Sequence, residues 1–259
     1  MRNLYKLINH EFRFIYKLVI IISVILVLGQ NLLIYISAGE YTSGRYIPFE
    51  DLLSESGVPV VFYICFVLIL ACCVYSVISD YYGSKSIYTL MSIPGSRPYI
   101  FLSKTISGFI YLIMLATSQI ISIFLSYLLF STSYTVIEAN GLISYVRPVN
   151  GLFLAFVRSD FLRLLFPMSS EGIASNCMIA VSVILAVFFT SYCILAHRYF
   201  YLIFPVLNLL FVISVVNKKN NALYSENQNL FLYSIILLAF STYYVYQNIR
   251  WLRKSAILG

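Results

Sequence analysis

Residues 79–104 read SDYYGSKSIYTLMSIPGSRPYIFLSK, a polar, basic and proline-broken stretch in a chain that is otherwise mostly apolar. Long hydrophobic runs lie on both sides of it. Two packed helices are usually joined by only about 2–8 residues, so an insert of this length calls for its own explanation. It indicates a structured element held between two membrane helices.

The composition places the chain in a membrane. It has 259 residues, of which 61% are hydrophobic and 10% charged, whereas soluble domains have roughly 45–50% apolar and about 25% charged residues. The mean hydropathy is +0.88. The net charge of +7 fits basic residues that flank membrane helices. No basic cluster is long enough to follow a nucleic-acid backbone, so we expect no nucleic-acid partner.

Six apolar runs approach or exceed the roughly 20 residues that a spanning helix needs. We expect helices, because unpaired backbone groups are too costly in hydrocarbon. The first run is longer than the apolar core of a signal peptide, about 7–15 residues, so we expect it to be retained. We predict an all-α integral membrane protein with one transmembrane domain over residues 1–259. The predicted spans are 18–38, 58–78, 105–130, 177–196, 199–216 and 230–247.

Residues 1–17, MRNLYKLINHEFRFIYK, have the pattern of an amphipathic helix that lies in the membrane interface. Two roles stay open for it: anchoring in the membrane, or bracing the insert at 79–104 from the side. One face carries Leu4, Leu7, Ile8, Phe12 and Ile15, and the other mostly Arg2, Lys6, Asn9 and Arg13.

Most lysines and arginines fall before the first span, in the insert and after the last span. Because cytoplasmic segments are enriched in these residues, we expect both termini in the cytoplasm of a multi-pass cell-membrane protein. The largest outer segment is then 131–176. Within it, residues 150–167 are apolar and helical in pattern but carry Arg158, Asp160 and Arg163. This amphipathic helix either lies on the outer surface or dips inward as an outer gate.

The sequence offers no catalytic or metal-binding motif. Its histidines, His10 and His197, are not spaced to act together, and its five cysteines follow no zinc-ligand spacing. Walker-type loops and paired carboxylates are absent as well. The spans carry Ser, Thr, Asn and Gln, which either pack helices together or line a substrate path; Pro205 and Asn208 suggest a kink in the fifth span. Examples of these polar residues are Gln30, Asn31, Thr117, Ser118, Gln119, Ser122, Ser126, Thr190, Ser191, Asn208 and Ser234.

Within the insert, residues 84–91 can form two turns of helix in which Ile87, Leu90 and Met91 share a face. Pro94 and Gly95 end it. Pro98 then suits the first turn of the next helix. An apolar face on a short cytoplasmic helix predicts a protein partner, because such a helix docks readily in a groove.

The stretch KSIYTLMSIPGSRPYIFLSK resembles the segment between the second and third spans of ABC-2 type transporter permeases. Ser92, Ile93, Pro94, Arg97 and Lys104 stand at the matching positions. Six spans, an N-terminal amphipathic helix and cytoplasmic termini are similar to that family as well. Lys85 and Ser86 stand where many members have Gly-Thr, after an acidic step that is here only Asp80.

The resemblance implies that the short helix is a coupling helix that fits a cleft on a separate ATPase subunit. It implies contact through Lys85, Ser86, Ile87, Tyr88, Thr89, Leu90 and Met91, and a geometry set by Pro94, Arg97 and Lys104. ATP and magnesium would then sit on the partner, with no cofactor and no enzymatic activity on this chain. A second permease chain, identical or different, would complete a dimer. An amphipathic peptide, antibiotic or lipid-like substrate leaving a Gram-positive cell is the implied cargo.

Two alternatives remain open beside an export permease. One is a sensor or mechanotransmitting membrane subunit that an associated ATPase drives without transport. The other is a polytopic membrane enzyme, which would need reactive groups at membrane depth that the spans do not provide.

Overall fold

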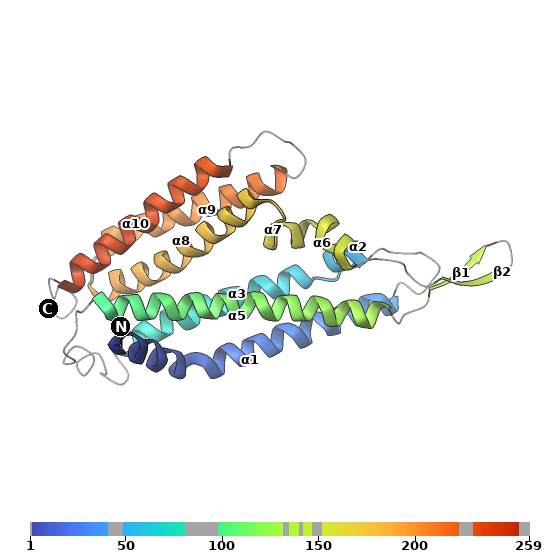
Figure 1. Ribbon diagram of the computed structural model, residues 1–259, viewed down its shortest axis with the longest axis horizontal. Helices are drawn as coiled ribbons and strands as arrows, with labels where there is room; N and C mark the ends of the chain where they lie inside the picture. The colour runs from blue at the N-terminus through green and yellow to red at the C-terminus, as the bar shows by residue number, and fades with distance from the viewer. Residues whose placement is uncertain are drawn as a thin grey trace. The chain divides into compact units, whose positions relative to one another are not determined.

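The computed structural model describes residues 2–40, 49–80, 98–131, 135–139, 142–146, 152–222 and 230–253. Long helices make up most of this part of the chain (Figure 1). Five of the described helices are long and apolar enough to cross a bilayer, which confirms a mainly helical, multi-pass membrane protein. These candidate spans are Leu4–Ser37, Val58–Ile78, Pro98–Leu129, Ser170–Leu195 and Tyr199–Lys219.

The sixth predicted span lies in α10 (Leu230–Arg253), a helix of 24 residues. It is not among the five candidates. Its second half carries Tyr243, Tyr244, Tyr246, Gln247 and Asn248, which lower the hydropathy of the helix. A helix forms where we expected one, and its crossing of the membrane stays a prediction.

The first helix, α1 (Arg2–Glu40), is 39 residues long and covers both the predicted interfacial helix and the first predicted span. There is no break at residues 17 and 18. At 1.5 Å per residue the helix rises about 58 Å, whereas the hydrocarbon core is about 30 Å thick. The amphipathic first turns therefore continue the span beyond the hydrocarbon.

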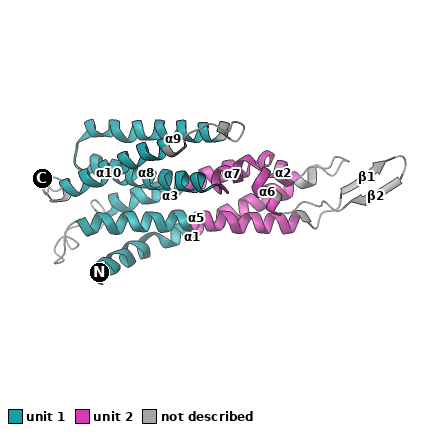
Figure 2. Ribbon diagram, turned by 45° about the horizontal axis from the view of Figure 1, so that its top comes forward, with its two compact units in different colours: residues 1–20, 68–113, 169–259 teal, residues 21–67, 114–168 magenta. Residues whose placement is uncertain are grey.

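The described chain forms two compact units, coloured separately in Figure 2. The first comprises Met1–Ile20, Leu68–Ile113 and Ser169–Gly259. It contains the first turns of α1, the end of α3 (Val58–Ile78), the beginning of α5 (Pro98–Ser131), α8 (Ser170–Leu195), the 3-10 helix η2 (Tyr199–Leu202), α9 (Ile203–Ala222) and α10.

Small and aromatic residues fill the core of this first unit. Gly108 of α5 faces Phe188 of α8 so closely that a Cβ on Gly108 would lie 3.1 Å from the ring. Phe189 of α8 packs against Tyr244 and Trp251 of α10, with ring centroids 4.9 and 5.3 Å apart. The tight approach of α5 to α8 thus depends on glycine at position 108.

Pro205, from which we expected a kink, is the third residue of α9. Proline costs little there, because the first turn of a helix has no internal partners for its N–H groups. Asn208, one turn later, donates from Nδ2 to the Ser182 carbonyl of α8 at 3.3 Å. The two residues mark the junction of η2 with α9 and a contact to α8.

The second unit comprises Ile21–Val67 and Met114–Met168. It contains the rest of α1, α3 and α5, together with α2 (Phe49–Glu55), α6 (Leu152–Arg158) and α7 (Asp160–Leu165). Phe161 of α7 meets Phe62 of α3 with ring centroids 5.7 Å apart. Gly57, between α2 and α3, has φ of 76°, a left-handed conformation that favours glycine.

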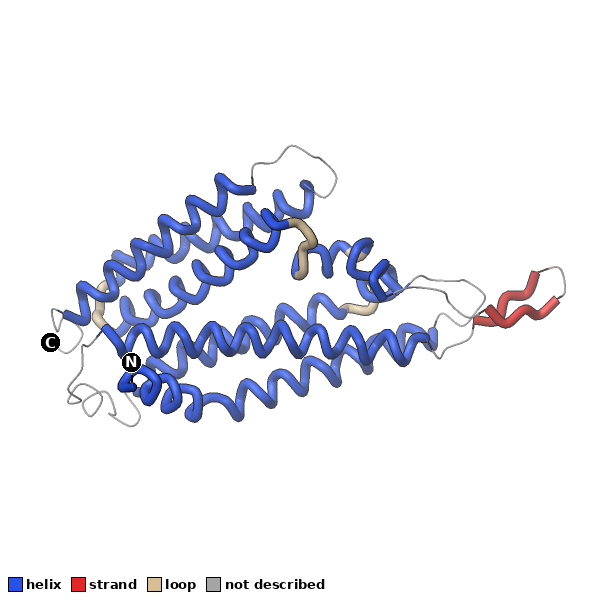
Figure 3. The backbone as a smooth tube through the Cα atoms, viewed as in Figure 1, coloured by secondary structure: helices blue, strands red, loops and turns tan. Residues whose placement is uncertain are grey.

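The segment 131–176 holds more structure than the sequence predicted. Strands β1 (Thr135–Ala139) and β2 (Leu142–Val146) pair antiparallel, with Ile137 opposite Ser144 (Figure 3). The amphipathic stretch 150–167 forms two short helices, α6 and α7, which are interrupted at Ser159. The fold is therefore mainly helical with one small hairpin added.

Candidate functional site: a buried ionic cluster on α1, α3 and α5

Most residues of the predicted coupling segment lie outside the described residues. This holds for the predicted ATPase contacts at 85–91 and for Pro94 and Arg97. Lys104 is described, and it lies in the second turn of α5 (Pro98–Ser131), with Pro98 in the first turn as the sequence predicted. The structure therefore describes only the two ends of the insert, residues 79–80 and 98–104.

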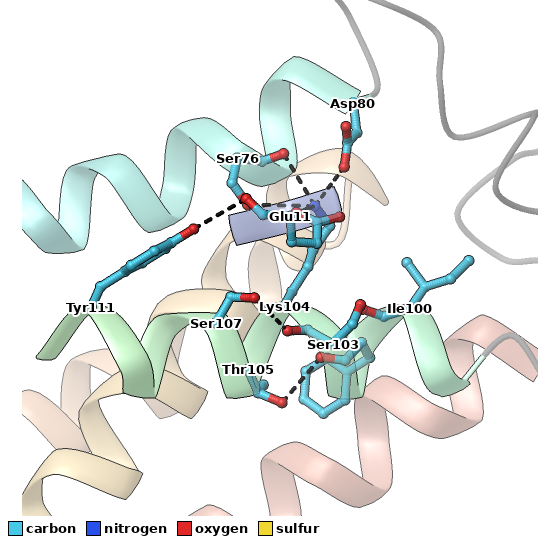
Figure 4. Close-up of polar contacts among 10 residues, drawn as sticks. Glu11, Ser76, Asp80, Ile100, Ser103, Lys104, Thr105, Ser107 and Tyr111 are labelled. Carbon is cyan, nitrogen blue, oxygen red and sulfur yellow. Dashed lines mark hydrogen bonds and ion pairs between the residues drawn. The ribbon is translucent and has the colours of Figure 1, made fainter. Parts of the chain in front are cut away.

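The Lys104 side chain is fully buried and points toward two carboxylates from different helices (Figure 4). Its Nζ donates to Glu11 Oε2 of α1 at 2.9 Å and to Asp80 Oδ2 at 2.5 Å. It also lies 3.3 Å from the Ser76 carbonyl oxygen and 3.4 Å from Ser76 Oγ. We call Glu11, Ser76, Asp80 and Lys104 the ionic cluster.

Local structure brings these residues together. Ser79 and Asp80 extend α3 by a widened π-helical turn, a feature that often marks functional positions. On α5, Ile100, Phe101, Lys104 and Ser107 are buried and follow helical spacing, so Lys104 belongs to the packed face. Because the side chain is fully buried, its charge must be balanced by protein groups.

The neighbouring hydroxyls on α5 do not serve the cluster. Ser103 Oγ donates to the Ile100 carbonyl at 2.9 Å, and Ser107 Oγ donates to the Ser103 carbonyl at 2.9 Å. Thr105 Oγ1 similarly bonds carbonyls one turn earlier. These groups satisfy themselves within the helix, so the Lys104 ammonium depends on Glu11, Asp80 and Ser76.

The energetics of the cluster are those of a buried ion network. Removing two carboxylates and an ammonium from water is expensive, and their attraction repays the cost only with close geometry. Here both carboxylates lie within 3 Å of the ammonium. Loss of one member would leave a buried charge without its partner. The cluster can therefore fix the positions of α1, the end of α3 and the beginning of α5 relative to one another.

The N-terminal helix has a second attachment next to the cluster. Tyr111 of α5 donates from its hydroxyl to the Glu11 carbonyl at 3.1 Å. The ring of Phe12 stacks on that of Tyr111, with centroids 6.0 Å apart. The first turns of α1 are thus fastened to α5 through both the backbone and the side chain of Glu11, as the bracing hypothesis requires.

A separate polar group lies in the second unit, among residues that the sequence had marked as packing or path-lining. Gln30 Nε2 donates to Gln119 Oε1 at 2.8 Å and to the Val58 carbonyl at 3.2 Å. Ser126 Oγ donates to Asn31 Oδ1 at 3.1 Å. These bonds join α1, α3 and α5, so the residues act in helix packing.

Histidines and cysteines are the other side chains that could carry chemistry. Within it, no three His, Cys, Asp or Glu side chains are grouped to hold a metal ion. The five cysteines are free thiols. His197 has φ of 52° in the turn after α8, and its Nδ1 lies 3.2 Å from the Tyr199 hydroxyl. This is a local turn contact.

Glu11 and Asp80 are the functional candidates that sequence reasoning missed. The sequence marked Asp80 only as the acidic step before the short helix of the insert, and it gave Glu11 no role. Acidic residues are rare in this chain, which has ten, but Glu11 is 93 positions from Lys104 and no sequence signal links the two. Comparison with family models, with curated proteins and with solved structures finds no match.

Proposed function

We propose that this chain is the membrane-spanning permease subunit of an ATP-driven ABC exporter. Its insert between α3 and α5 would receive motion from a separate cytoplasmic ATPase. One observation supports the proposal: the ionic cluster joins the two ends of the insert, Asp80 at its start and Lys104 at its end, to Glu11 of α1.

The cluster suits the transmission of force. An insert pushed by a partner can move helices only if its ends do not slip against them. A direct ion pair between Asp80 and Lys104 prevents the two ends from moving independently, and Glu11 extends the connection to α1. A loop that only linked two helices would need no buried charges at its base, where ionisable groups are costly.

The remaining parts of the proposal follow from the resemblance in the sequence. Both termini and the insert lie in the cytoplasm, and ATP and magnesium bind the partner subunit. This chain has no ATPase activity of its own. It works with a second permease chain and moves an amphipathic peptide, antibiotic or lipid-like molecule outward.

Co-purification with an ATPase tests the proposal. Tyr88 and Met91, both in the predicted coupling helix, are replaced together by Asp in a tagged chain expressed in its native host. We expect the wild type to co-purify with a Walker-motif ATPase and with vanadate-sensitive hydrolysis. Because two charges on the apolar face prevent its burial, the double variant should lose both.

A matched control uses the same residue types elsewhere. Tyr134→Asp with Met168→Asp alters the predicted outer segment and should leave the ATPase bound. Equal retention of a Walker-motif ATPase by both double variants would contradict the coupling role. Hydrolysis by the purified chain after complete removal of other proteins would contradict the permease assignment.

A further inference from the structure

The first turns of α1 carry a basic and aromatic groove on a face of the helix that does not include Glu11. The described residues that line it are Asn9, Phe12, Arg13, Tyr16 and Lys17. They recur three and four positions apart, so they form one stripe along the helix. The groove is an open hollow of about 550 Å³ on the surface.

The charges in this groove are available. Arg13 and Lys17 are exposed, and neither forms an ion pair within the ranges that the structure describes. The nearest carboxylate in sequence, that of Glu11, is buried and bound to Lys104. Two cations one turn apart, with the Asn9 amide one turn before them, make a row of donors for an anion.

The aromatic residues give the groove a fixed wall. Phe12 stacks on Tyr16 with ring centroids 6.0 Å apart, and it also stacks on Tyr111 of α5. The rings of Phe12 and Tyr16 are only partly exposed. Tyrosine at a membrane interface settles among headgroups, so the wall suits the boundary between hydrocarbon and water.

The position of the groove along α1 indicates which kind of anion binds there. The charge-free run of α1 begins at Leu18, directly after Lys17, so the two cations lie at the membrane boundary. Ile20, three positions after Lys17 and four after Tyr16, continues the same stripe and is 45% exposed. A ligand here meets cations at one end and this exposed apolar side chain at the other.

We propose that Asn9, Arg13 and Lys17 bind the phosphate headgroup of an anionic phospholipid, with its acyl chains along Ile20. A lipid satisfies both ends of the groove, whereas a free phosphate satisfies only the cations. Basic grooves on the cytoplasmic side of membrane proteins hold such headgroups. This site does not depend on the proposed ATPase partner.

Native mass spectrometry of the purified full chain in neutral detergent tests the site. Detergent removes the surface potential of a bilayer, so retained lipid reports a site rather than general attraction. The probes are phosphatidylglycerol and phosphatidylcholine. We expect retention of phosphatidylglycerol in preference to phosphatidylcholine. Arg13→Gln with Lys17→Gln should weaken phosphatidylglycerol binding about tenfold or more, since each variant position loses a charge-assisted hydrogen bond to the phosphate.

Two controls separate the explanations. Arg250→Gln removes an exposed charge at the end of α10 and should leave retention within twofold of wild type. Inorganic phosphate at millimolar concentration should not displace the lipid. Equal losses in the double variant and in Arg250→Gln would overturn the proposal, as would unchanged binding in the double variant or full displacement by inorganic phosphate. Size-exclusion profiles confirm that each variant is folded.

Discussion

Asp80 and Lys104 are 24 positions apart in the chain, yet Oδ2 of one lies 2.5 Å from Nζ of the other. This contact closes the insert between α3 and α5 into a loop with a fixed base. Glu11 reaches the same ammonium from a third helix. A single side chain, that of Lys104, therefore connects α1 and the end of α3 to the beginning of α5.

The first prediction concerns that side chain. Replacing Lys104 with Met keeps a long apolar stem but leaves the carboxylates of Glu11 and Asp80 buried without a cation. We expect a loss of about 3–5 kcal/mol in the free energy of unfolding, the usual cost of breaking one side of a buried pair. Titration with a denaturing detergent, followed by circular dichroism, measures it.

Two further variants sharpen this test. Lys6→Met changes an exposed lysine outside the basic groove and should alter stability by no more than about 0.5 kcal/mol. The triple variant Glu11→Gln, Asp80→Asn, Lys104→Met should recover part of the loss, because it removes the uncompensated charges together. If Lys104→Met is as stable as the wild type, the cluster does not hold the helix ends.

Local pattern in the sequence was enough to place most of the long helices. The second span was predicted at 58–78, and α3 occupies the same residues, because Gly57 precedes the charge-free run and Asp80 follows it. The hairpin was missed although Asn140-Gly141, a strong hairpin signal, stands between its strands. Only helical patterns were considered for this segment, so the hairpin signal was not recognised.

The candidate site was less predictable, for a physical reason. Lys104 and Glu11 are 93 positions apart, and no periodicity in either helix reports which distant charges will meet. Lys104 was identified through its place in the insert, whereas Glu11 and Asp80 acquire their roles only through tertiary packing. Pairings of this kind depend on how whole helices approach one another.

The second prediction concerns the amide pair of the second unit. Gln30 and Gln119 are buried and share a hydrogen bond of 2.8 Å. Substituting either by Leu leaves the other amide short of a partner, so each single variant should be less stable. The double variant should lose less than the sum of the singles by about 0.6–1.7 kcal/mol, the range for such bonds inside membranes. A coupling energy of zero from denaturing-detergent titrations would argue against the bond.

The third prediction compares two glycines in transmembrane helices. A Cβ on Gly108 would lie 3.1 Å from the Phe188 ring, whereas one on Gly29 would find its nearest neighbour, Val61 Cγ1, at 3.7 Å. Gly29→Ala should therefore be neutral or stabilising, since alanine favours helix by up to about 1 kcal/mol. Gly108→Ala should fall below it by about 1–3 kcal/mol, the cost of overpacking. Equal unfolding temperatures would contradict this close approach.

The last prediction concerns orientation in the membrane. Placing the insert in the cytoplasm requires Ser84 to be hidden from outside reagents, and Ser43 and Ser133 to be reachable. Single cysteines at these serines, in a chain whose five native cysteines are replaced by Ser or Ala, are treated in intact cells with a membrane-impermeant maleimide. The reagent should label positions 43 and 133, and should label position 84 only after the cells are opened. Labelling of position 84 in intact cells would place the insert outside, where no ATPase could drive it, and the proposed function would fail with it.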